Sequence, residues 1–265
     1  MRERDILHRF VFENTHVRGQ IVHLDATWQA VLERHDYPPA VRPLLGQAMA
    51  ATALLSATIK FNGALIFQVQ SAGPVRLLLA QATSQRPLRG LARWDGEVQP
   101  APFPQLVGDG RLAITIDTAF GAERYQGIVE LGADNLAAAV EEYFARSEQL
   151  ATRLWLAADG ARAAGMLLQR LPGEDADQDA WDRAVHLGAT LTDDELLRFP
   201  VQEVLHRLYH GEDIRLFEAE PVSFRCSCSR GRIANMLRAL GYESVQALIR
   251  EQGSVRVDCE FCNQR

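Results

Sequence analysis

Four cysteines lie in the last 40 residues of this 265-residue chain, and the 225 residues before them contain none. They form two close pairs, Cys226 with Cys228 and Cys259 with Cys262. A CxC pair and a CxxC pair can place four thiolates around one metal ion, and a set of four sulfur ligands favours zinc. The sequence therefore predicts a tetrahedral zinc site made by all four cysteines.

The same thiols allow other chemistry. Two structural disulfides would need an oxidising compartment, which nothing in the sequence indicates. A constant structural zinc site is the simplest interpretation of the spacing. If the site lies near the surface, however, peroxide or hypochlorous acid could join each close pair as a disulfide, Cys226 with Cys228 and Cys259 with Cys262, and zinc would leave. The residues alone leave a fixed zinc site and a reversible redox switch both open.

Basic residues lie close to the predicted zinc site in the sequence, at Arg225, Arg230, Arg232 and Arg256. Four thiolates around one Zn²⁺ carry a formal charge of about −2, because each thiolate brings one negative charge. Cationic neighbours offset this charge and keep the sulfurs as thiolates, the form that oxidants attack. The arginines therefore favour a reactive cluster.

Two runs of apolar residues at helical spacing separate the cysteine pairs and end at Gly241 and Gly253. The runs are Ile233, Met236, Leu237 and Leu240, then Val245, Leu248 and Ile249. Two antiparallel helices here would bring the CxC and CxxC pairs together. We interpret residues 222–265 as a C-terminal zinc-binding domain, which would also be a redox-switch domain if its thiols oxidise reversibly, and so small a unit should need its metal to stay folded.

The rest of the chain predicts an α+β fold with a large N-terminal domain of sheet and helix, residues 1–172. A helical run covers residues 40–60, and a second helix over 135–149 follows the N-cap candidate Asp134. Strand-like runs between turn sequences occupy residues 65–70, 75–80, 88–94, 112–118, 124–131, 152–158 and 163–171. Arg89, Arg93 and Arg124 lie on these runs and could form a set of ion pairs.

The composition becomes acidic after residue 172, where we expect a metastable helical linker over residues 173–221. Thr192 and Glu195 match a capping box, and Pro200 is placed to open another helix. Helices this short are unstable alone, so the linker must pack against its neighbours. His206 and His210 share a helix face and could bind a metal, but no third ligand lies nearby and ordinary packing or capping is favoured.

The composition and motifs argue against several classes of function. A net charge of −6 argues against a general affinity for nucleic acid or anionic membranes. The first ten residues lack an apolar core, so we expect no secretory signal and a soluble, cytoplasmic protein. The sequence contains no recognisable catalytic motif, so we expect a protein without enzymatic activity. A nucleic-acid-binding protein with a structural zinc-ribbon tail remains the alternative, because residues 222–265 hold seven arginines against four acidic residues.

Several long stretches resemble the redox-regulated thirty-three-kilodalton heat-shock chaperones of bacteria, and the resemblance covers essentially the whole chain. The stretches are LHRFVFENTHVRG, GPVRLLLA, ERYQGIVEL, YFARSEQL, GMLLQRLPG and RLYHGEDIRLFE, together with the two cysteine pairs. Members of that family generally continue past the second pair, whereas this sequence ends three residues after Cys262.

The resemblance implies an ATP-independent holdase chaperone of the stress response, without catalytic turnover. Its reduced form would hold one zinc per chain through Cys226, Cys228, Cys259 and Cys262 and would be inactive. Oxidation would form the two neighbouring disulfides, release zinc, unfold the zinc domain and destabilise the linker. The activated protein would form a homodimer and bind unfolding client proteins, with no nucleic acid or membrane as partner.

Overall fold

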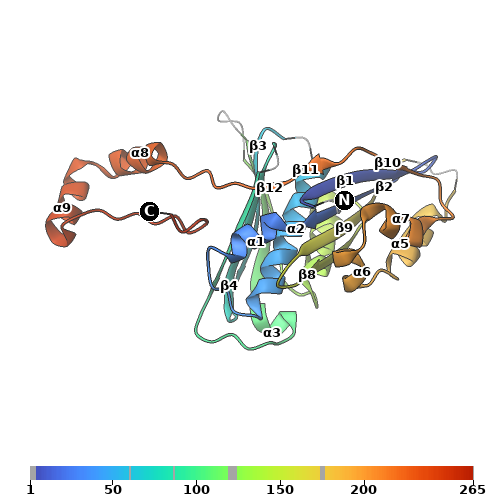
Figure 1. Cartoon of the computed structure of the whole chain (residues 1–265), viewed down its shortest axis with the longest axis horizontal. Helices are drawn as coiled ribbons and strands as arrows, with labels where there is room; N and C mark the ends of the chain where they lie inside the picture. Colours follow the sequence, from blue (N-terminus) through green and yellow to red (C-terminus); the bar gives the residue numbers. More distant parts are fainter. Residues whose placement is uncertain (1–3, 60, 86, 119–123, 174–176, 265) are drawn as a thin grey trace.

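A computed structural model describes residues 4–264 of the chain, except residues 60, 86, 119–123 and 174–176. Helix α2 (Val41–Thr58) runs through the centre of the body, between two sheets (Figure 1). Twelve of its 18 residues are buried, since it meets β4 and β5 on one side and β2, β8 and β9 on the other. Its many alanines allow both sheets to approach closely, as a helix buried on all sides requires.

Six strands form the first sheet, sheet A, in the order β10–β1–β2–β9–β8, with β11 also paired to β1. All its pairs are antiparallel. The strands are β1 (Ile6–Phe12), β2 (Val17–Leu24), β8 (Thr152–Ala158), β9 (Ala163–Arg170), β10 (Ile214–Leu216) and β11 (Glu220–Pro221). One face of sheet A packs on α2, and linker helices cover the other.

The second sheet, sheet B, has the order β12–β5–β4–β3–β6–β7. Only the β12–β5 pair is parallel among the pairs described in this sheet. The strands are β3 (Gly63–Ser71), β4 (Val75–Thr83), β5 (Pro87–Trp94), β6 (Gly110–Thr118), β7 (Tyr125–Glu130) and β12 (Ser223–Phe224). Alternate residues of β3, Leu65, Phe67 and Val69, are buried toward α2, as expected for a sheet covered on one face.

The remaining helices are α1 (Ala26–Leu32), α3 (Phe103–Val107), α4 (Leu136–Tyr143) with a π-helical turn (Phe144–Glu148), α5 (Ala180–Gly188), α6 (Asp193–Arg198), α7 (Val201–Tyr209), α8 (Arg230–Leu240) and α9 (Tyr242–Gln252). Of these, α1, α3 and α4 add buried residues to the core around α2, and α4 contacts strands of both sheets. None of the described helices is long and apolar enough to cross a membrane.

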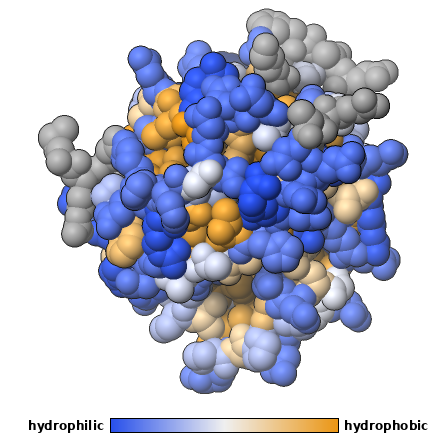
Figure 2. Space-filling view, turned by 90° about the vertical axis from the view of Figure 1, so that its right-hand side faces the viewer, coloured by the Kyte–Doolittle hydropathy of each residue, from blue (hydrophilic) through white to orange (hydrophobic). Residues whose placement is uncertain are grey.

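Helices α5, α6 and α7 cover the outer face of sheet A (Figure 1). Val201, Val204 and Leu208 of α7 pack in one cluster with Phe10 and Met166 of the sheet. The outward side of these helices is mostly hydrophilic, with small hydrophobic patches (Figure 2). After α7, the chain adds β10 and β11 to the edge of sheet A and β12 to the edge of sheet B. The chain that follows α7 therefore touches both sheets, with the end of the linker on sheet A and the start of the C-terminal segment on sheet B.

Helices α8 and α9 stand away from this body (Figure 1). Neither helix has a buried residue, and Leu240, Tyr242 and Ile249 are exposed. The two predicted helices are confirmed, and they end at Gly241 and Gly253 as expected. The apolar residues of the two helices form no core, because the helices lie against too little other structure to cover those residues.

The predicted α+β fold is confirmed, with its central helix and all of the expected strands. The capping box of Thr192 and Glu195 is present, and Pro200 precedes α7. Asp134 as an N-cap was wrong, because Asn135 accepts the hydrogen bond from the Ala138 amide. The sequence reasoning missed β1 and β2. Both faces of sheet A are covered, so β2 is buried at nearly every position and lacks the alternation that marks a strand.

Gly19 of β2 provides a test of the packing beneath the linker. A Cβ at this position would lie 2.1 Å from the fully buried ring of Phe10. We expect Gly19→Ala to lower the free energy of unfolding by about 1–3 kcal/mol, the usual effect of overpacking. Thermal unfolding followed by circular dichroism measures the change. Gly160→Ala is the matched control, since a Cβ there has nothing within 4 Å, and equal stability of both variants would contradict the packing described.

Candidate metal centre

The four cysteine sulfurs lie within 4.8 Å of one another. The Sγ atoms of Cys226 and Cys259 are 3.5 Å apart, and those of Cys228 and Cys262 are 3.3 Å apart. Zn–S bonds of about 2.3 Å in a tetrahedron would place the sulfurs about 3.8 Å apart, close to this arrangement. The cluster offers only sulfur, the donor set that suits zinc. The four residues are thus brought together, and their role as ligands stays a prediction.

Hydrogen bonds fix the backbone on both sides of the cluster. The first pair follows β12, and the Arg225 amide donates to the Leu88 carbonyl of β5. Ser229 then caps α8 by accepting from the Arg232 amide. The second pair lies in a tight turn, where the Asn263 amide donates to the Cys259 carbonyl over 2.7 Å. Helices α8 and α9 connect the two halves, and each sulfur lies within 3.5 Å of a sulfur from the other pair.

The thiols of the cluster differ in acidity. Burial opposes ionisation of Cys226, but hydrogen bonds from the Cys228 backbone N–H and from the other three thiols lower its pKa to about 7. Hydrogen bonds with Cys262 and Cys226 raise the pKa of Cys228 to about 12. Burial also raises the pKa of Cys262. Without metal, one sulfur therefore ionises near neutral pH while Cys228 and Cys262 keep their protons.

The cluster rests against sheet B. Arg93 forms an ion pair with Glu260 at 2.5 Å, and the Glu260 carbonyl lies 2.7 Å from Nε2 of His35. A hollow of about 460 Å³ opens beside Cys226 and Cys228, and three of the four cysteines are partly exposed. Small solutes can therefore reach the sulfurs.

The arginine that contacts a cluster sulfur comes from an unexpected part of the chain. Nη1 of Arg89 on β5 lies 3.7 Å from the Cys226 sulfur, although 137 residues separate the two. Among the described residues, no side-chain hydrogen bond joins the predicted neighbours Arg225, Arg230, Arg232 and Arg256 to a sulfur, and Arg232 donates instead to Ser227. Arg89 sits on a predicted strand, but no local signal in the sequence could pair it with Cys226.

The other residues singled out in the sequence form no comparable metal site. His206 and His210 are exposed with ring centroids 6.0 Å apart. Within the described part of the chain, only the four cysteines gather as a group of three or more side chains able to hold a metal. Arg124, also considered for an ion pair, lies 3.5 Å from Asp117 on the same sheet.

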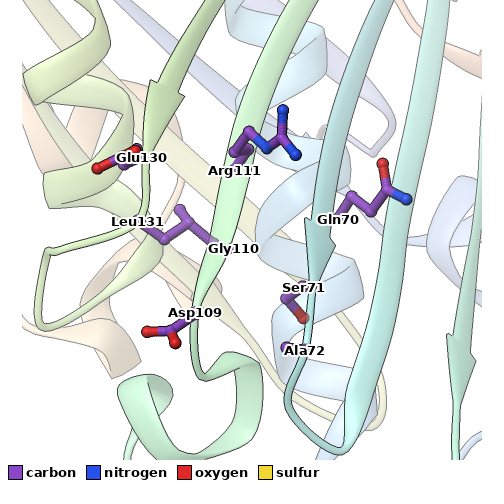
Figure 3. A pocket seen from close by; sticks show the side chains of 8 residues that line it. All are labelled: Gln70, Ser71, Ala72, Asp109, Gly110, Arg111, Glu130 and Leu131. Carbon is purple, nitrogen blue, oxygen red and sulfur yellow. The ribbon is translucent and has the colours of Figure 1, made fainter.

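A hollow of about 480 Å³ lies at one end of sheet B (Figure 3). Arg111 lies between Gln70 and Glu130 on neighbouring strands. The hydroxyl of Ser71 donates to the Val75 carbonyl, so it is engaged in the turn. The eight residues that line the hollow include no cysteine and no histidine. No nucleophile with a neighbouring base is assembled there.

Comparison with known proteins places the whole chain in one group. A family model described as "Hsp33 protein" matches residues 5–265. The 33 kDa chaperonin of Nitrosococcus oceani is 56% identical over 264 residues, covering 100% of this chain and 91% of that protein. The 33 kDa chaperonin of Methylobacillus flagellatus is 47% identical, covering 99% and 91%.

A solved structure shares the fold. The crystal structure of the 33 kDa chaperonin, heat shock protein 33 homolog, from Thermotoga maritima matches with a TM-score of 0.84 and 22% identity. The match covers 98% of this chain and 93% of that one.

The acidity of the cluster predicts how its metal affinity depends on pH. The raised pKa values of Cys228 and Cys262 mean that both thiols are protonated in the metal-free protein at neutral pH. Each must lose its proton to bind a metal, so protons compete increasingly as the pH falls. We expect zinc affinity to fall by at least about a hundredfold per pH unit below 7, one factor of ten for each proton. Competition with a chromogenic chelator measures it, and a pH-independent affinity would exclude ligation by these thiols.

Proposed function

Because the chain belongs to the Hsp33 family, we propose that it is a redox-regulated, ATP-independent holdase that is inactive while reduced and zinc-bound. The observation that carries this proposal is the gathering of four sulfurs within 4.8 Å at the junction between the linker and sheet B. The names of the relatives support a chaperone role, and we infer a cytoplasmic protein with no enzymatic activity and no nucleic-acid or membrane partner.

Four thiolates are the ligands we propose for one zinc ion per chain, from Cys226, Cys228, Cys259 and Cys262. Bound zinc would supply about 10–16 kcal/mol of folding free energy to the C-terminal segment. That segment has little else to hold it, because α8 and α9 bury no residue. Its fold therefore depends on the thiolates remaining available as ligands.

Oxidation removes the ligands. Two thiolates pass two electrons to one peroxide molecule, which takes up two protons and leaves as two waters, while the sulfurs join as a disulfide. We propose the pairs Cys226–Cys228 and Cys259–Cys262. The sulfurs of Cys226 and Cys259 and those of Cys228 and Cys262 also lie within 3.5 Å of each other, and peptide mapping of the disulfides distinguishes the two pairings. Either pairing consumes all four ligands.

Unfolding of the C-terminal segment would spread into the linker. We retain the division into an N-terminal domain (1–172), a linker (173–221) and a zinc domain (222–265) as part of this proposal. Helices α5, α6 and α7 have 9, 6 and 9 residues, too few for stable isolated helices. They stay folded through contacts with sheet A and through the strands that follow them. Freeing β12 from β5 would remove one of these anchors.

The client-binding surface would be the face of sheet A that α5–α7 cover, with the apolar side of those helices. Its buried sheet residues are Phe10, Phe12, Val17, Ile21, Ala157, Ala164, Met166 and Leu168. An exposed apolar face of this size attracts other proteins, including unfolding clients and a second copy of the chain. We propose that the oxidised form is therefore a homodimer that holds clients without ATP.

Peroxide treatment tests the proposal as a whole. We expect the oxidised chain to lose one zinc, to contain two disulfides and to suppress aggregation of a chemically unfolded client protein. A metal-sensitive dye measures zinc, peptide mass spectrometry maps the disulfides, and light scattering measures aggregation. The reduced, zinc-loaded chain is the control and should leave aggregation unchanged. A chain that keeps its zinc after oxidation, or protects clients equally in both states, would overturn the proposed switch.

A substitution in the linker separates exposure of sheet A from cysteine chemistry. Val204 of α7 is fully buried against the sheet, so Val204→Asp would bury an unpaired charge at a cost of several kcal/mol, on the order of the linker's own stability. We expect this variant to suppress client aggregation while reduced and still zinc-bound. The control Gln202→Asp introduces the same residue at an exposed position of α7. An inactive reduced Val204→Asp that binds 8-anilinonaphthalene sulfonate no better than the control would argue against this client surface.

A further inference from the structure

The side chain of Arg89 joins sheet B to both halves of the cysteine cluster. Its Nε and Nη2 donate to Oε1 of Gln81 on the neighbouring strand, over 2.9 and 2.5 Å. Its Nη1 lies 3.7 Å from the sulfur of Cys226, in the first cysteine pair. Its Cζ lies 4.0 Å from the ring centroid of Phe261, between the two cysteines of the second pair. One guanidinium thus contacts two segments that are far apart in the sequence.

The geometry of these contacts suits an arginine and a charged sulfur. The planar guanidinium offers five donors in a fixed arrangement and can stack on an aromatic ring while it donates at its edge. Gln81 holds the plane of the group, which leaves Nη1 directed at Cys226. Hydrogen bonds to a charged acceptor are stronger than those to a neutral one. The contact with Cys226 is therefore strongest when that sulfur is a thiolate, as it would be in a four-thiolate metal site.

A second group of contacts holds the same segment without touching a sulfur. Arg93, on the same strand as Arg89, pairs with Glu260, and both side chains are more than half exposed. Exposed ion pairs of this kind contribute little to stability. The Nδ2 of Asn263 also donates to the Arg34 carbonyl over 3.3 Å. These contacts do not depend on the charge of the cluster, so Arg93 is a natural control for Arg89.

We propose that Arg89 is a positioning residue that docks the C-terminal segment on sheet B only while Cys226 is a thiolate. This inference rests on the proposed function, since it requires the cluster to change state. When Cys226 enters a disulfide, its sulfur gives up its negative charge, and the guanidinium is left beside a weak neutral acceptor. The strand β5 then loses the Arg89 contact with the segment on oxidation, while the exposed Arg93–Glu260 pair remains. The Arg89 side chain thus couples the charge of the Cys226 sulfur to the contact between the segment and sheet B.

Hydrogen exchange at the Arg225 amide tests the proposal in the reduced, zinc-loaded full chain. This amide donates to the Leu88 carbonyl of β5, so its exchange reports undocking of the segment. We expect Arg89→Gln to speed its exchange about tenfold, equal to about 1.4 kcal/mol. Arg89→Lys keeps the positive charge but lacks the planar guanidinium, so its exchange rate should lie between those of the unchanged chain and Arg89→Gln. Arg93→Gln should change the rate less than about twofold, as expected for an exposed pair. Equal rates in Arg89→Gln and Arg93→Gln would overturn the proposal.

A double-mutant cycle with Cys226→His tests whether the effect of Arg89 depends on the Cys226 thiolate. Histidine is a neutral ligand that can keep a four-coordinate zinc site with three cysteines. We expect Arg89→Gln to change exchange less than about twofold in the Cys226→His background, with zinc content measured in the same samples. A tenfold effect that persists there would show that Arg89 only supports the fold. Neither experiment uses an oxidant, so a negative result for Arg89 would not contradict the proposed function. If peroxide fails to release zinc, the two exchange experiments can still be interpreted.

Discussion

Four sulfur atoms hold together a C-terminal segment that has almost no core of its own. Among the described residues from 222 onward, only Val222 and Cys262 are buried. A globular unit normally gains its stability from buried apolar surface, and this one cannot. On the proposed function, whatever joins the sulfurs, a metal or covalent bonds, would decide whether the segment has a defined structure. The chemistry of the thiols would then control the conformation of the segment.

On the proposed function, the linker would transmit this control because the linker and the strand directly after it are built into the two sheets. The three linker helices cover sheet A, the next two strands extend the edge of that sheet, and β12, just after the linker, extends the edge of sheet B. Each of these elements is short, so each depends on the others for its place. The stability of the region is consequently cooperative, and loss of one anchor weakens the rest. A change of a few atoms at the cysteines can then alter the surface on the far side of sheet A.

The sequence predicted those parts of the molecule that local patterns specify. The spacing of Cys226, Cys228, Cys259 and Cys262 indicated a single cluster, and helical periodicity located α2, α8 and α9. It could not place β1 and β2, because sheet A is covered on both faces and β2 loses the alternation of polar and apolar residues. The partner of the cluster, Arg89, was also beyond reach, since that contact depends on the parallel pairing of β12 with β5.

Among the described residues beyond position 171, only Val222 is buried in the core around α2. On the proposed function, the body of the protein can therefore stay folded while the chain after it unfolds. When reductant and metal return, that chain meets sheet A already folded, together with the free edges of both sheets. Refolding then requires about ninety residues to dock on a formed surface, and the long-range sheet pairings to be made again are those of β10 and β11 with β1 and of β12 with β5. The arrangement suits a molecule that switches repeatedly within its lifetime.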